Sequence, residues 1–156
     1  MKFTFEEDAS LKEDEIVIKH NNNQKLILKL SSFLSNVEKA SSSLKVYKDE
    51  NEYYLDTKEF IFFETANGIV YAHTVNSAYE VKYKLYELEE MLANNFVRIS
   101  KSSICNVNHI FSIKRNIASS NQVSFNNSNK KVYVSRMYYP ILKTKLEKRL
   151  YNEFQK

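Results

Sequence analysis

The stretch from 95 to 113 holds side chains that are well suited to contact a polyanion. Arg98 and Lys101 stand three residues apart. Short hydrogen-bonding side chains lie among and after them: Ser100, Ser102, Ser103, Asn106 and Asn108. Cations bind phosphate groups, and serine or asparagine can bond to the edges of nucleic-acid bases. The same residues also fit a solvated strand-turn-strand edge in which serine and asparagine only cap turns. Composition alone does not separate these two interpretations.

A second group of cations precedes the end of the chain. Lys130 and Lys131 come before the apolar run 132–134, and Ser135 is an N-cap candidate for a closing helix. A cap at Ser135 would place Arg136 in the first helical turn, where a cation opposes the helix dipole. Such a placement suggests an external anion, such as phosphate, or an arginine that reads a base. The alternative is an exposed arginine whose dipole penalty is on the order of a few tenths of a kcal/mol.

The charge of the chain is distributed unevenly, although its net value is only +4. Residues 1–65 contain 9 basic and 13 acidic side chains, whereas residues 66–156 contain 14 basic and 6 acidic ones. No acidic residue occurs between Glu90 and Glu147. Nine cations lie in that interval: Arg98, Lys101, Lys114, Arg115, Lys130, Lys131, Arg136, Lys143 and Lys145. So long a one-sided stretch indicates a polyanionic partner.

Composition also excludes several classes of chemistry. Cys105 is the only cysteine, which rules out an internal disulfide framework and a multi-cysteine zinc site. The three histidines are far apart in the sequence, so we expect no metal site and no cofactor. With Gly68 as the only glycine, loops that cradle phosphate with several glycines are absent. The apolar runs are too short to cross a bilayer and the N-terminus is acidic, which predicts a cytoplasmic protein.

An enzymatic role would have to rely on Cys105 and His109 as a thiol and its base. Four residues apart in a strand-turn-strand region, they need not face each other, and no third orienting group is apparent. Cys105 is better interpreted as a small buried hydrophobe. We therefore predict that the chain is not an enzyme.

Apolar periodicity predicts many short strands and few helices. Strands are expected at 2–6, 15–19, 44–47, 52–55, 60–64, 69–74, 96–99, 110–114, 122–125 and 132–134. Helices are expected at 24–37, at 79–93 and at the C-terminus, although 26–28 would also suit a strand. Pro140 allows the last helix to start at Ser135 or near Tyr139. Asn67-Gly68 predicts a type I′ hairpin, because that turn needs positive φ at both central residues. The pattern is that of an α+β chain that is predominantly β.

Several motifs, taken in order, resemble the LytTR-type DNA-binding domains, which are output domains of many bacterial response regulators and of stand-alone regulators. The similarity runs from about Val46 to Lys148. Its motifs are FIFFE at 60–64, LYELE at 85–89, FVRISKS at 96–102, ICN at 104–106 with Ile110 after it, and VSR at 134–136. Their order is specific to that family, whereas each motif alone would be weak. Only about 45 residues precede the similar region, so we expect no phosphorylatable receiver domain in this chain.

The resemblance implies an elongated arrangement of small antiparallel β-sheets with flanking helices that sends loops into successive major grooves, often as a dimer. We expect residues 46–156 to form this domain, and residues 1–45 to form a small β-β-α accessory element for dimerisation or sensing. Position by position, the resemblance implies DNA contacts from Asn67, from Lys101 with its neighbours Arg98 and Ser102, and from Arg136. The composition adds Lys130 and Lys131 to this predicted DNA-binding set.

Together these features predict a bacterial transcription regulator that binds double-stranded DNA sequence-specifically as a homodimer. The alternative is a protein-interaction or RNA-binding module without enzymatic activity. It is suggested by the 11 tyrosines and 10 phenylalanines, which could stack on bases. Many of these rings stand at positions patterned for a core, such as Phe60, Phe62, Phe96 and Phe125, which favours a structural role.

Overall fold

The computed structural model of the chain describes residues 19, 23–39, 43–116 and 119–154. The described helices are α1 (Gln24–Lys39), α2 (Leu85–Met91) and α3 (Tyr139–Phe154), with 3-10 turns η1 (Thr57–Glu59) and η2 (Val107–His109). The described strands are β1 (Ser43–Lys48), β2 (Asn51–Asp56), β3 (Phe62–Ala66), β4 (Ile69–His73), β5 (Ala78–Val81), β6 (Phe96–Ser100), β7 (Ser103–Asn106), β8 (Ile110–Lys114), β9 (Asn121–Phe125) and β10 (Lys131–Val134).

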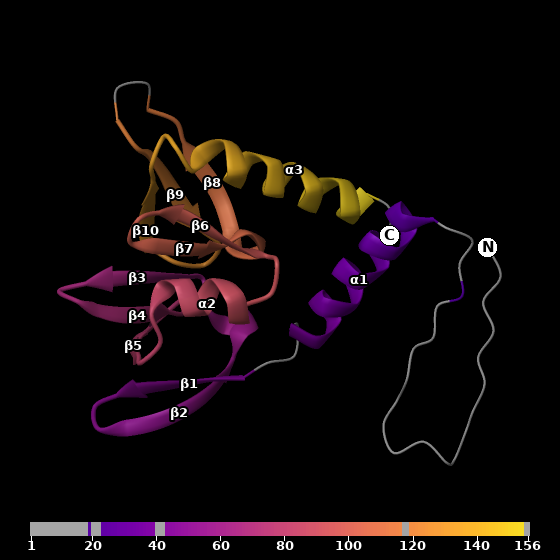
Figure 1. Cartoon of the computed structure of the whole chain (residues 1–156). Coiled ribbons are helices and arrows are strands. Elements are labelled where there is room, and N and C mark those ends of the chain that lie inside the picture. The colour runs from indigo at the N-terminus through magenta and orange to yellow at the C-terminus, as the bar shows by residue number, and fades with distance from the viewer. Residues whose placement is uncertain (1–18, 20–22, 40–42, 117–118, 155–156) are drawn as a thin grey trace, which may run out of the picture.

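The strands form two antiparallel sheets that lie one above the other (Figure 1). The larger sheet has the strand order β2-β1-β5-β4-β3-β7-β6, and the smaller one has the order β10-β9-β8. Helix α2 lies beside the larger sheet, and α3 extends away from the smaller one (Figure 1). The predicted fold class, α+β with small antiparallel sheets and flanking helices, is confirmed.

The centre of the larger sheet is covered on both faces, which gives two hydrophobic cores. In β3, Phe62 packs in a core shared with the smaller sheet and Leu142 of α3. The next residue, Phe63, packs in a second core with Leu88 of α2. Neighbouring side chains of a strand point to opposite faces, so an unbroken apolar run such as 60–63 is typical of a strand buried on both sides.

Strand β7 is an element that periodicity did not predict. All four of its residues are buried. Ile104 joins the core beside α2 and Cys105 joins the core beside α3, while Ser103 and Asn106 at the two ends are polar. The segment therefore shows neither an alternating pattern nor a long apolar run. Burial raises the pKa of the Cys105 thiol, as befits the predicted small hydrophobe.

The helix expected at 79–93 is wrong in its first part, which is strand β5. Val81 pairs with Val70 of β4 and is buried. Its spacing to Leu85 therefore reflects two neighbouring elements that pack in the same core. Helix α2 begins at Leu85, where the backbone N–H of Lys84 donates to Glu87 Oε2 at 2.7 Å. This bond is one half of a capping box and satisfies a backbone donor at the helix start.

The closing helix begins at Tyr139, which decides between its two possible starts. Pro140 consequently lies in the first turn, where the missing N–H removes no helical bond. Leu142 is buried and Leu146 is half-buried, whereas Leu150 is exposed. The apolar face of α3 therefore packs on the sheets only over its first half.

The helix expected at 24–37 is confirmed as α1. Asn23 caps it, because its Oδ1 accepts a hydrogen bond from Leu26 N at 3.1 Å. The strands expected at 2–6 and 15–19 lie outside the described residues, except for Lys19, which is not in a strand. The accessory element predicted for residues 1–45 therefore stays a prediction.

Asn106 is a buried polar side chain that joins three segments behind the β6–β7 hairpin. Its Nδ2 donates to the carbonyl of Phe60 at 2.9 Å. Its Oδ1 accepts from Asn95 Nδ2 at 2.8 Å and from the backbone N–H of Asn108 at 3.1 Å. The Asn106 backbone N–H donates to the carbonyl of Ile61 at 2.9 Å. These bonds fix the positions of β3, β6 and η2 relative to one another.

Candidate nucleic-acid interface

The β3–β4 turn places the first predicted contact residue at an exposed hairpin tip. Ala66 pairs with Ile69, which leaves Asn67 and Gly68 as the two turn residues. Their φ angles are 51° and 79°, so both have the left-handed backbone of the predicted type I′ turn. The Asn67 side chain is exposed. An asparagine held at such a tip can both donate and accept hydrogen bonds.

The β6–β7 turn lies next to this hairpin at the same end of the larger sheet. Strand β7 pairs with β3 so that Ser103 lies opposite Glu64. One residue further on, the N–H of Thr65 donates to the carbonyl of Ser102 at 2.8 Å. Lys101 and Ser102 are both exposed at this turn. Two turns that are far apart in the sequence are thus held together by backbone pairing.

Arg98 supports the β6–β7 turn from behind. Its Nε donates to the carbonyl of Ser100 at 2.7 Å, and its Nη2 donates to the carbonyl of Lys101. Its Nη1 forms an ion pair with Glu89 Oε2 of α2 at 2.7 Å. The guanidinium therefore satisfies two carbonyls of the turn and ties the turn to α2. We infer that Arg98 positions Lys101 and Ser102, whereas the DNA contact predicted for Arg98 itself stays a prediction.

Replacing Arg98 by alanine is expected to lower the free energy of unfolding by about 1–3 kcal/mol, because two carbonyls of the turn lose their hydrogen-bond donor and the ion pair with Glu89 is removed. Urea denaturation measures this loss. Hydrogen exchange at the Ser102 amide should accelerate more than exchange in β9. The variant Glu89→Gln retains an acceptor for Arg98 and should lose less stability. If the Ser102 amide exchanged at the same rate in Arg98→Ala as in the wild type, the positioning role would be contradicted.

Arg136 joins the same end of the molecule through the connection between β10 and α3. The N–H of Ser135 donates to the carbonyl of Ile99 at 2.9 Å, next to the β6–β7 turn. Ile99 itself stands at a register shift between β6 and β7, as in a β-bulge. Arg136 is exposed and precedes the first residue of α3, rather than lying in its first turn. The carbonyl of Ser135 accepts from the N–H groups of Tyr138 and Tyr139, both at 3.1 Å, and closes the turn that leads into the helix.

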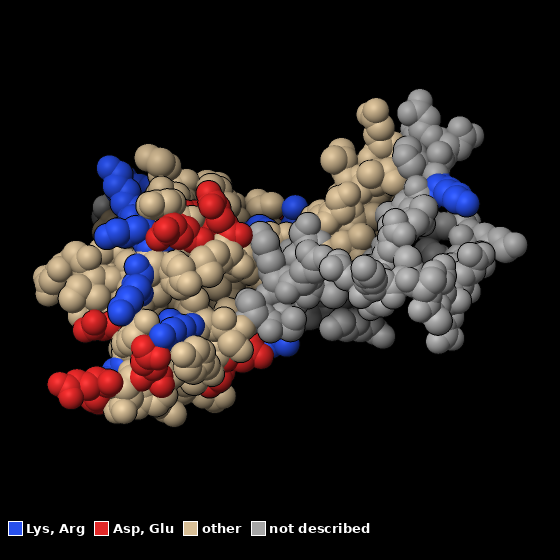
Figure 2. All heavy atoms as spheres, turned by 60° about the horizontal axis from the view of Figure 1, so that its bottom comes forward, with Lys and Arg blue, Asp and Glu red and all other residues tan. Residues whose placement is uncertain are grey.

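Charge alone does not mark a nucleic-acid surface on the face shown in Figure 2. There, acidic and basic side chains lie among one another over the described residues. On the β1–β2 hairpin, for example, Lys45 Nζ lies 2.7 Å from Glu52 Oε2. The candidate interface therefore depends on the residues of the three adjacent turns and on the way that the backbone holds them.

Lys130 immediately precedes β10 and Lys131 begins it, whereas Arg136 follows its end, so the structure separates these cations. Lys130 Nζ donates to the carbonyls of Thr74, at 2.8 Å, and Ser77. Partial burial lowers the pKa of Lys130. Lys131 is exposed, but it shares the remote end of the strand.

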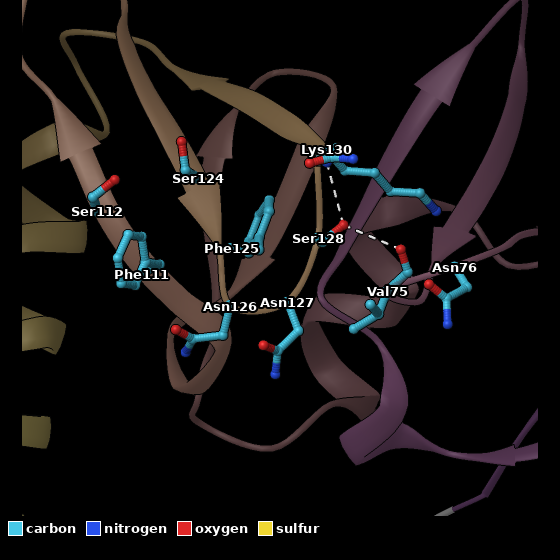
Figure 3. A pocket seen from close by; sticks show the side chains of 11 residues that line it. Val75, Asn76, Phe111, Ser112, Ser124, Phe125, Asn126, Asn127, Ser128 and Lys130 are labelled. Atoms are coloured by element: carbon cyan, nitrogen blue, oxygen red, sulfur yellow. Dashed lines mark hydrogen bonds between the residues drawn. The ribbon is translucent and has the colours of Figure 1, made fainter.

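The contacts of Lys130 belong to a joint between the two sheets. Beside it, Ser128 Oγ donates to the carbonyl of Val75 at 3.1 Å (Figure 3). The loop that carries Val75 and the loop that carries Ser128 line an open pocket of about 890 Å³ together with Phe111 of β8. This arrangement gives Lys130 a structural role.

His73 lies in the same region and is held in its neutral form. It stacks on Phe62 with ring centroids 4.1 Å apart. Its Nε2 lies 3.0 Å from Glu64 Oε1, but neither ring nitrogen has a hydrogen bond within the described part of the chain. Burial, followed by the Lys130 ammonium, lowers the pKa of His73 to about 4. Burial and Lys130 therefore outweigh the attraction of the Glu64 carboxylate for a proton.

This lowered pKa predicts an acid-sensitive fold. Between about pH 6.5 and pH 4 the unfolded chain binds a proton at His73 that the folded chain does not. Stability should therefore fall across that window as the pH decreases, by about 2–3 kcal/mol from this group, and should be level above it. Urea denaturation of the wild type and of His73→Phe at a series of pH values isolates this contribution. If the free energy of unfolding changed with pH in the same way in both proteins, His73 would not be the cause of the acid sensitivity.

Cys105 and His109 do not form a thiol–base pair. The thiol is fully buried, and His109 Nε2 is within 2.7 Å of the carbonyl of Lys58. No group of three or more histidine, cysteine or acidic side chains among the described residues is placed to hold a metal ion. The described helices include none that is long and apolar enough to cross a membrane.

Two side chains that organise the interface were missed as such by sequence reasoning. Glu89 anchors Arg98 across nine sequence positions and two different elements. Asn106 was quoted within a motif, but its buried bonds reach Phe60, which is 46 positions away. Local spacing carries no signal for such distant partners. The one available signal was that Asn106 is a polar residue between the apolar residues 104–105 and Val107.

Comparison with known proteins identifies the family. The family model of the LytTr DNA-binding domain matches residues 50–147. Uncharacterized HTH-type transcriptional regulators of Staphylococcus aureus strains NCTC 8325 and COL are each 39% identical over 70 residues, which is 45% of this chain and 48% of theirs. The chain thus matches about half the length of these relatives.

A solved structure agrees with the sequence match. It is the LytTr DNA-binding domain of a protein described as a methyl-accepting/DNA response regulator from Bacillus cereus. The TM-score is 0.63 at 25% identity, and the similarity covers 68% of this chain and 97% of that one. With the family model matching more than half of the chain, the protein belongs to the LytTr DNA-binding domain family.

Proposed function

We propose that this protein is a transcription regulator that binds double-stranded DNA sequence-specifically and reads the major groove through its loops. One observation carries the proposal. Turns from three distant parts of the sequence are joined at one end of the molecule by the bonds Thr65 N to Ser102 O and Ser135 N to Ile99 O. Because the turns are already ordered, little conformational entropy is lost when they bind a ligand.

The residues at this end supply two kinds of contact. Lys101 is a flexible point charge suited to phosphate, which fixes the register of a protein on the duplex. Arg136 has a planar guanidinium that can donate two bonds to guanine in the major groove. Asn67 and Ser102 add short groups that bond to bases or to the backbone. We assign Arg98 and Lys130 to positioning and to the joint between the sheets.

The alternative of an RNA-binding or protein-interaction module has less support. Base stacking needs exposed rings, whereas Phe60, Phe62, Phe63 and Phe125 are buried in the two cores. Exposed rings such as Tyr54, Tyr86 and Phe111 lie on other elements than the three turns. We further propose that the protein acts in the bacterial cytoplasm as a homodimer, and that residues 1–45, with α1, form its accessory element. Paired copies would place two sets of turns on repeated half-sites.

A salt titration tests the proposed function. Binding of the full chain to a pool of random duplexes and to single-stranded RNA is measured by fluorescence anisotropy from low to physiological salt. The affinity for duplex should fall steeply, with a logarithmic slope of about −0.9 for each phosphate neutralised. Selection from the same pool should enrich a defined sequence. Failure of the folded protein to bind duplex at low salt, or stronger binding to the RNA, would refute the proposal.

A further inference from the structure

Two cations of the acid-free stretch, Lys114 and Arg115, lie at the same end of the smaller sheet as Arg136. Lys114 ends β8 and pairs with Gln122 near the start of β9. Asn121 in turn pairs with Val134, the last residue of β10. Because the pairing is antiparallel throughout, the end of β8, the start of β9 and the end of β10 lie at one end of the smaller sheet. Arg136 follows the last residue of β10 by two positions.

A ring contact connects Arg115 with the start of α3. The guanidinium carbon of Arg115 lies 5.7 Å from the centre of the Tyr139 ring, and Tyr139 is the first residue of the helix that follows Arg136. Lys114 and Arg115 are both exposed. In the part of the chain that the structure describes, neither forms an ion pair with a carboxylate. Their charges are therefore available to an external anion.

This pair adds a fourth segment to the three adjacent turns already described. The tips at Asn67 and at Lys101 are joined through β3 and β7, and the Lys101 tip is joined to the Arg136 connection through Ile99. The end of β8 adds a further cationic segment at the end of the smaller sheet from which the Arg136 connection leaves. A polyanion bound at the Arg136 connection would therefore have these two cations close to it.

We propose that Lys114 and Arg115 bind the phosphate backbone of the duplex beside the base pairs that Arg136 reads, and so extend the interface to the end of β8. The inference rests on the proposed function, since it concerns the same DNA. Phosphate is the chemical class that fits, because the ammonium of Lys114 is a point charge and the guanidinium of Arg115, which lies against the Tyr139 ring, can donate two bonds to phosphate oxygens. The pair therefore adds affinity and fixes orientation, while base discrimination stays with Arg136.

The test measures salt dependence in the variants Lys114→Gln, Arg115→Gln and the double variant. Each single variant should reduce the magnitude of the logarithmic salt slope by about 1, and the double variant by about 2. The affinities for the selected sequence and for an unrelated duplex should fall by the same factor. Lys58→Gln is the matched control, because Lys58 is an exposed lysine in η1, before β3, and should leave the slope unchanged.

Two further variants separate DNA binding from a structural role of Arg115. Arg115→Lys retains the charge and should keep the wild-type slope. Tyr139→Leu removes the ring but no charge, so it can lower the melting temperature without changing the slope. If the wild type binds duplex and the double variant retains its slope and affinity, the inference is wrong while the proposed function stands. If the wild type binds no duplex, both are wrong.

Discussion

Replacing Arg136 by alanine is expected to cost about 1–3 kcal/mol in binding to the preferred duplex, a 5- to 150-fold loss of affinity, and to relax specificity at one base pair. The guanidinium is exposed on the connection between β10 and α3, which the Ser135–Ile99 bond holds beside the β6–β7 turn. A bidentate arginine discriminates because the wrong base leaves its donors unpaired. Affinities for duplexes substituted at each position of the selected site measure the effect.

The matched comparison for this prediction is Lys101→Ala. Lys101 lies on the neighbouring turn, and its flexible ammonium is assigned to phosphate. Its loss should weaken all duplexes by a similar factor and reduce the salt slope by about 1. If Arg136→Ala also weakened every duplex equally, Arg136 would be a phosphate contact and base reading would lie elsewhere.

Replacing Asn106 by alanine is expected to produce the largest loss of stability, about 3 kcal/mol. The amide is buried and bonded to Phe60, Asn95 and Asn108. Its removal leaves buried polar groups without partners, each at a cost of about 1–3 kcal/mol, although water can satisfy some of them. Denaturation in urea at pH 7 measures the change in the free energy of unfolding.

Asn108→Ala serves as the control for Asn106. Its own side chain is exposed, and only its backbone N–H takes part in the network. This variant should stay within about 0.5 kcal/mol of the wild type. An Asn106→Ala protein as stable as Asn108→Ala would show that the buried bonds do not hold the hairpin in place.

Local signals predicted much of the fold because they have local causes. Asn67-Gly68 predicted its turn, since few other residues tolerate positive φ at two successive positions. The helix expected at 79–93 failed because Val81, which pairs across the sheet, happens to lie one helical turn before Leu85. Strand β7 was missed because burial on both faces erases the alternation by which strands are recognised.

The candidate site shows the same division between local and distant causes. The sequence predicted which residue types could contact DNA, and the structure brings Asn67, Lys101, Ser102 and Arg136 to one end of the molecule. The sequence could not predict that the Lys130 ammonium bonds to carbonyls more than 50 positions away. Such partners depend on how the sheets meet, which one-dimensional spacing does not encode. That these four residues contact DNA stays a prediction.

The most direct test of DNA binding by the three turns is to map the surface that a duplex covers. Hydrogen exchange of the full chain is compared with and without a saturating amount of the selected duplex. If the three turns contact DNA, we expect added protection at 65–68, at 100–103 and at 134–137, with little change in the joint at 126–130. Protection concentrated at 126–130 or along α1, with the three turns unchanged, would contradict it.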